Sequence, residues 1–140
     1  KGSQIMSFYE TFKPDDNLES GKGVDLDYGE SGVITIHRAG GSNQKYKRVA
    51  AQKLKPFSRQ IKLGTADPEV IDRVMAEIYA EAVIIGWKGV KGEDGKNLSF
   101  TKENVVKILT DLPDLFEDIQ NQAESLSTFR ANQAEEIAKN

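Results

Sequence analysis

The sequence contains no cysteine and a single histidine, His37. Without thiols the chain can form neither a disulfide framework nor a thiolate metal site, which fits a reducing cytoplasm. A lone histidine with no second ligand at metal-binding spacing is best interpreted as a surface or edge-strand residue. Carboxylate pairs such as Asp15-Asp16 fall in expected loops, and Gly40-Gly41-Ser42 lacks the spacing of a phosphate-binding loop. We therefore expect no catalytic residue, no metal site, no cofactor and no enzymatic activity.

Long apolar runs and a strong charge excess are also absent. The longest run, Ala82–Ile85, is far shorter than the roughly 20 residues that span a bilayer, so we expect neither a membrane segment nor a signal segment. The formal net charge of −3 and the pI of 5.3 disfavour general affinity for nucleic acid. A chain of 140 residues fits one domain. We expect that domain at residues 24–140, an irregular arm at residues 6–23, and a purification-tag remnant at residues 1–5.

The first part of the chain combines an aromatic arm with a β-hairpin. Phe8, Tyr9 and Phe12 can pack on the domain's own core or on a neighbouring subunit, and we favour the first alternative. Alternating and β-branched residues at 24–28 and 33–38 then flank a glycine-bounded turn. This pattern predicts two antiparallel strands.

The segment at residues 43–64 is strongly basic, with seven cations and no acidic residue. Its apolar stripe predicts a helix, and Pro56 should kink it or divide it into two short helices. The cations can form a solvated face balanced by the acidic helix that follows, which we favour. Alternatively Lys47, Arg48 and Lys55 can meet an acidic protein partner, or the segment can bind nucleic acid.

A long amphipathic helix is predicted from Asp67 onward. Asp67 can cap free N–H groups, Pro68 suits the first helical position, and Gly86 can supply a left-handed stop. Trp87 directly follows that stop, so we expect its ring to fold over the ends of two helices as part of the core. Asp94-Gly95 predicts a hairpin-like turn.

Two further helices are predicted after this turn. Thr101 can cap the first, with Phe100 placed for a hydrophobic staple, and Pro113 suits the first turn of the second. Apolar residues recur at spacings of three and four from Leu112 onward and continue more loosely towards the C-terminus. The last turns can therefore project as a helix that meets a partner, or form an ordinary core helix with a solvated tail. The candidate partner-binding residues on this stretch are Leu126, Phe129 and Ile137.

These elements predict a mainly helical α+β domain. An N-terminal β-hairpin precedes a bundle of about four to five helices with a short hairpin-like loop. Strands do not alternate with helices along the chain, so a doubly wound sheet is not expected.

Four motifs within residues 81–123 resemble a tail assembly chaperone of long-tailed bacteriophages, of the lambda-like siphophage and prophage family. They are Gly86-Trp87-Lys88-Gly89-Val90, Glu93-Asp94-Gly95, the helix start at Phe100–Asn104, and Asp111-Leu112-Pro113-Asp114-Leu115. The likeness extends more weakly to the hairpin at residues 24–38. The residues that carry it are interpreted as structural: Gly86, Trp87, Gly89, Asp94, Gly95, Phe100 and Pro113.

This resemblance implies a non-catalytic assembly factor of the host cytoplasm that is not expected in the mature virion. Such chaperones bind and solubilise the tape measure protein and help to recruit tail tube protein, here through a longer frameshifted form. A homo-oligomer would strengthen binding to a long client. Two alternatives remain: a small structural component of the tail, and a nucleic-acid-binding module that uses residues 45–62.

Overall fold

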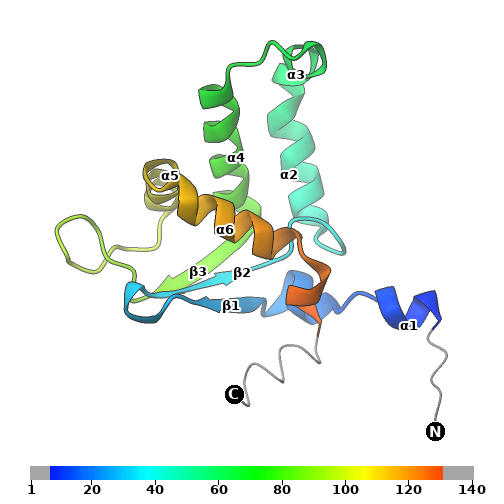
Figure 1. Ribbon diagram of the computed structural model, residues 1–140, viewed down its shortest axis with the longest axis horizontal. Coiled ribbons are helices and arrows are strands. Elements are labelled where there is room, and N and C mark those ends of the chain that lie inside the picture. The colour runs from blue at the N-terminus through cyan, green and yellow to red at the C-terminus, as the bar shows by residue number, and fades with distance from the viewer. Residues whose placement is uncertain (1–6, 131–140) are drawn as a thin grey trace, which may run out of the picture.

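The computed structural model describes residues 7–130. A three-stranded antiparallel sheet lies along one side of the molecule, and the helices α2 to α6 lie on one face of it (Figure 1). The mainly helical α+β class predicted from the sequence is confirmed. The expectations for the tag remnant at residues 1–5 and for Ile137 concern positions outside the described residues.

The predicted β-hairpin forms the first two strands of the sheet. Strand β1 (Val24–Asp27) pairs with β2 (Val33–Ile36), so that Val24 faces Ile36 and Asp27 faces Val33. A short 3-10 turn, Gly29–Ser31, joins the strands. Ile34 and Ile36 are buried on one face of β2, as a period of two requires.

The third strand corrects the predicted helix stop at Gly86. Helix α4 (Pro68–Ala82) already ends at Val83, and residues Ile84–Lys88 form β3 against β2. The β-branched residues before Gly86 suit a strand, and β2 offers an edge on which their backbone groups can pair. Gly86 therefore lies opposite Thr35 in the sheet, and Trp87 lies opposite Ile34 rather than over two helix ends. At the other end of α4, Asp67 caps the helix and Pro68 takes the first position, as predicted.

The basic segment and α4 form a helical hairpin, residues 44–82, that projects away from the sheet (Figure 1). Helix α2 (Gln44–Leu54) leads outward, a 3-10 turn (Lys55–Phe57) follows, and α3 (Ser58–Leu63) forms the tip. The division into two short helices at Pro56 is confirmed. Helices α2 and α4 pack against each other through an apolar cluster of Val49, Val74, Ile78 and Ala82.

The last two predicted helices are α5 (Lys102–Asp111) and α6 (Pro113–Glu124). Thr101 accepts a hydrogen bond from the Asn104 N–H at 3.1 Å, and Pro113 takes the first position of α6, as predicted. The hairpin-like loop before α5 is also confirmed, because the Leu98 N–H donates to the Val90 carbonyl at 2.8 Å.

The expectation of a helix that continues beyond Leu126 is wrong for the described residues. Helix α6 ends at Glu124, Ser125 is extended, and a short 3-10 helix, Leu126–Phe129, follows. Phe129 is only 1% exposed and belongs to the main core, which lies between the sheet and helices α4 to α6. The chain turns at Ser125 because burial of this ring outweighs a continued solvent-facing helix.

The N-terminal arm contains a short helix, α1 (Phe8–Phe12), followed by a π-helical turn, Asn17–Gly21. Its three aromatic side chains do not pack on the domain's own core, which corrects our preferred expectation. Phe8, Tyr9 and Phe12 are 81%, 87% and 58% exposed.

Candidate partner-binding surface

The side chain of Asn43 connects the helical hairpin to the sheet through hydrogen bonds. Its side-chain NH2 donates to the carbonyls of Arg38 and Ala82 at 2.8 and 2.9 Å, while its side-chain oxygen accepts from the Tyr46 N–H at 3.2 Å. One buried amide thus caps α2 and ties it to the end of β2 and the end of α4. The position at which the hairpin leaves the body is fixed by these bonds.

A buried ion pair lies next to this joint. An Arg38 Nη1 donates to Glu19 Oε2 at 2.8 Å, and the Ser42 N–H and Oγ donate to Glu19 Oε1 at 2.7 and 2.9 Å. Burial raises the pKa of Glu19, but the hydrogen bonds from Ser42 and the Arg38 guanidinium outweigh it and hold the pKa below its usual value. Gly41 approaches so closely that an added Cβ would overlap Glu19 and Arg38. The arm and the start of the hairpin are thereby held together.

The helical hairpin carries exposed cations that have no carboxylate partner among the described residues. Lys53 pairs with Glu77 of α4 at 3.8 Å. Within residues 7–130, none of the other six cations of the basic segment makes an ion pair. The predicted candidates Lys47, Arg48 and Lys55 are all exposed there. In the described structure, α4 therefore pairs directly with only one cation of this segment.

Apolar side chains also lie exposed at the tip of the hairpin. Ile61 and Leu63 on α3 are 45% and 64% exposed, and Val70 at the start of α4 is 40% exposed. Arg59 and Lys62 are exposed on the same short helix. A surface that combines apolar and cationic groups suits a protein segment that carries apolar and acidic residues.

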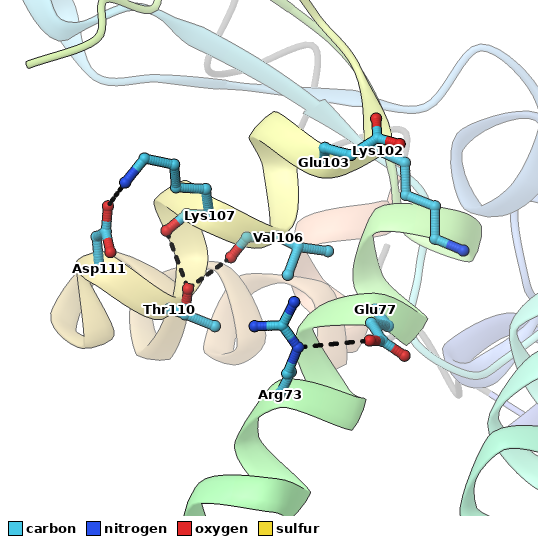
Figure 2. A pocket seen from close by; sticks show the side chains of 8 residues that line it. All are labelled: Arg73, Glu77, Lys102, Glu103, Val106, Lys107, Thr110 and Asp111. Atoms are coloured by element: carbon cyan, nitrogen blue, oxygen red, sulfur yellow. Dashed lines mark hydrogen bonds and ion pairs between the residues drawn. The ribbon is translucent and has the colours of Figure 1, made fainter.

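The groove between α4 and α5 (Figure 2) has a different character, because its cations are paired. It has a volume of about 630 Å³. Arg73 pairs with Glu77 at 3.7 Å, and Lys107 pairs with Asp111 at 2.8 Å. Lys102 pairs with Glu81 at 2.7 Å, and this hydrogen bond lowers the pKa of Glu81 and raises that of Lys102. These pairs leave little unbalanced charge to attract a ligand.

The remaining sequence-predicted residues serve the fold in the described structure. The Trp87 Nε1–H donates to the Leu98 carbonyl at 2.9 Å, and its ring lies edge-on to Phe100 at a centroid distance of 5.3 Å. Gly89 and Gly95 have positive φ values of 68° and 80°, which favour glycine. These contacts fasten the hairpin-like loop to β3.

The predicted C-terminal binding residues and the surface found here do not coincide. Leu126 is half-buried and Phe129 is buried, whereas Lys47, Arg48 and Lys55 share the projecting hairpin. Sequence reasoning missed the apolar tip and the polar joint at its base. An apolar stripe at helical spacing does not reveal which of its members lack a packing partner.

Neither a metal site nor a membrane span is present in the part of the chain that the structure describes. No group of three or more His, Cys, Asp or Glu residues within 7–130 could hold a metal ion. Over the same residues, no helix has both the length and the apolar character needed to cross a bilayer.

A family model described as YdaY prophage protein matches residues 41–140. The matched range contains the helical hairpin, β3, α5 and α6, and leaves out the arm and the strands β1 and β2. Comparisons with curated proteins and with solved structures give no significant match. Because the family model covers more than half of the chain, this protein belongs to the YdaY prophage protein family.

Proposed function

We propose that this prophage protein is a tail assembly chaperone that binds and solubilises the tape measure protein in the host cytoplasm. Membership of a prophage family supports a phage-associated role. The resemblance of the motifs between residues 81 and 123 supports the narrower assignment to tail assembly. On this proposal the protein leaves before the virion is complete, and a longer frameshifted form recruits tail tube protein.

The observation that carries the proposal is the exposed surface of the helical hairpin. A long helical client shows apolar surface until its partners assemble on it, and such surface leads to aggregation. Ile61 and Leu63 offer apolar contacts to a client helix, while Lys47, Arg48 and Lys55 offer charge to the acidic residues beside its apolar stripe. The joint at Asn43 holds this surface away from the sheet, where a long helix can reach it.

The test is co-expression with a tape measure protein from the same prophage, with soluble client and co-purified client as readouts. The first variant, Ile61→Ser with Leu63→Ser, removes apolar groups from the tip. The second variant reverses Lys47, Arg48 and Lys55 to Glu. Both should fold, because these side chains are exposed, and both should lower the yield of soluble client.

A matched control separates surface recognition from net charge. Reversal of Lys22, Lys88 and Lys96 to Glu changes the net charge equally at exposed positions outside the hairpin. The control should solubilise the client as the wild type does. If the hairpin variants fold and still solubilise the client normally, the hairpin is not the binding surface.

Two other functions give different outcomes. A structural tail component should remain in purified virions, where mass spectrometry would detect it. A nucleic-acid-binding module using residues 45–62 should bind duplex DNA or RNA with an affinity that falls steeply as salt rises. Either result in place of client binding would overturn the chaperone proposal.

A further inference from the structure

The aromatic arm is a helical element that no apolar residue of the described chain buries. Ser7 and Glu10 form a capping box that holds α1 in a helical turn, although no residue of α1 is buried. The Arg130 guanidinium donates to the Thr11 carbonyl and so fixes the base of the arm to the body. Phe8 and Tyr9 are therefore held out in solvent, where exposure of two large apolar rings is unfavourable.

An apolar groove lies at the opposite end of the sheet. It has a volume of about 650 Å³ and is lined by side chains from β2, α5 and the start of α6, among them Ile34, Ile108, Leu112 and Leu115. Leu112 is 48% exposed at its edge. Its volume falls within the range of clefts that enclose small organic ligands, so it can take aromatic side chains.

In the described structure the arm lies away from the groove of its own chain. In Figure 1, α1 lies beyond one end of the sheet, whereas the β1–β2 turn that borders the groove lies at the other end. The Arg130 guanidinium holds the base of the arm at the Thr11 carbonyl. An arm held in this position leaves the groove of its own chain open to an arm from another molecule.

We propose that the aromatic arm of one protomer docks into the apolar groove of a second copy of this chain. Three aromatic side chains can bury at most about 450–750 Å² together, so burial of the exposed arm supplies about half of the roughly 800 Å² per partner of a standard interface. Each chain carries one arm and one groove at opposite ends, so the contact is head-to-tail. Two copies can exchange arms in a closed twofold dimer, or a series of copies can form a ring or an open chain. The proposal concerns self-association and does not depend on the chaperone function.

Sedimentation velocity over a range of protein concentrations tests the proposal. The arm variant, Phe8→Ser with Tyr9→Ser, and the groove variant, Leu112→Asp, should each remain folded and lose association by at least about tenfold. A control with Ile61→Ser and Leu63→Ser removes similarly exposed apolar groups from the hairpin tip. That control should associate as the wild type does, because the hairpin takes no part in this contact.

Mixing the two variants distinguishes head-to-tail docking from other contacts. The arm variant retains its groove and the groove variant retains its arm, so an equimolar mixture should form one-to-one dimers and nothing larger. If the groove variant alone associates, the contact is arm-to-arm, and if the arm variant alone associates, the contact is groove-to-groove. Either result, or a mixture that does not associate, shows that the proposal is wrong. A wild-type chain that stays monomeric at every concentration overturns it as well.

Cross-linking gives a second test, which detects the proximity of arm and groove directly instead of a loss of association. Because the chain has no cysteine, Tyr9→Cys with Leu112→Cys introduces one thiol on the arm and one beside the groove. Mild oxidation should link the double variant through both sites, as a doubly cross-linked dimer or as a ladder of longer oligomers, whereas each single variant should give at most a singly linked dimer. Absence of both products, with both thiols shown to be reactive, would contradict docking of the arm in the groove.

Discussion

Asn43 and Glu19 are the buried polar side chains other than Tyr79 in the described part of the chain, and both lie where the helical hairpin meets the sheet. A buried polar group is costly unless it is hydrogen-bonded, and each of these two has at least two partners. Their geometry is therefore restrictive, because any shift of the hairpin would break several bonds together. At the scale of single residues, these two side chains decide how the candidate binding surface is presented.

The ion pair of Glu19 predicts a specific acid sensitivity. Its folded-state pKa lies below the ordinary value of 4.5, so its contribution to stability is complete above that value and is lost as pH falls through the folded pKa. Glu19→Gln should lower the free energy of unfolding by about 3 kcal/mol at neutral pH, because Arg38 loses its buried partner. The variant should also lose less additional stability than the wild type below about pH 5.

Urea denaturation at a series of pH values measures both effects. Glu117→Gln, at an exposed position on α6, is the matched control and should follow the wild type closely. Parallel stability curves for the wild type and Glu19→Gln below pH 5 would show that this carboxylate does not supply the acid sensitivity.

The end of α6 shows at the scale of an element how one buried ring redirects a chain. Periodicity alone extends the helix, yet the structure turns at Ser125 and places Phe129 in the main core beside α6. A partner that bound Phe129 would first have to extract it from that core, which costs the free energy of its burial. Leu126 is only half-buried, so it can contact a partner without unfolding the domain.

We predict that Phe129→Ala lowers the free energy of unfolding by about 3–5 kcal/mol. The reason is that the ring is fully buried and its removal leaves a cavity. Leu126→Ala should cost distinctly less, because part of that side chain already contacts solvent. Thermal and urea denaturation of both variants measure these losses of unfolding free energy. Equal, small losses for both variants would show that Phe129 is not buried and is again a candidate partner contact.

At the scale of the whole molecule, the arm, the apolar groove and the helical hairpin lie on three separate parts of the surface. The arm lies beyond one end of the sheet, the apolar groove lies at the other end, and the helical hairpin projects from the helical side (Figure 1). A protein with this layout can associate through its ends while its hairpins remain free. Repeated weak sites along an assembly would gain strength on a long client through effective concentration.

Removal of residues 1–10 should leave the stability of the domain nearly unchanged. The truncation deletes Phe8 and Tyr9, which bury no core surface, and retains the Thr11 carbonyl that contacts Arg130. The melting temperature at a low, monomeric concentration should shift by no more than about 2 °C. A large drop measured by circular dichroism would mean that the arm supports its own domain, and self-association could then not be assigned to it.

Several features followed directly from the sequence because their signals are local. Asp67 and Thr101 cap their helices through N–H groups two and three residues away, and Pro68 and Pro113 fit first helical positions whose N–H groups need no partner. Pro56 divides the basic helix by its own ring geometry. The mainly helical class and the first β-hairpin follow from the same kind of short-range pattern.

The remaining features were decided by tertiary structure, because they depend on residues far apart along the chain. Residues 84–88 form a strand only because β2, about fifty positions earlier, offers an edge to pair with. The burial of Phe129 and the exposure of Phe8 and Tyr9 likewise depend on which apolar surfaces the folded body leaves uncovered. Helix caps are satisfied within one turn of chain, whereas strand pairing, burial and a free binding surface are properties of the assembled layers.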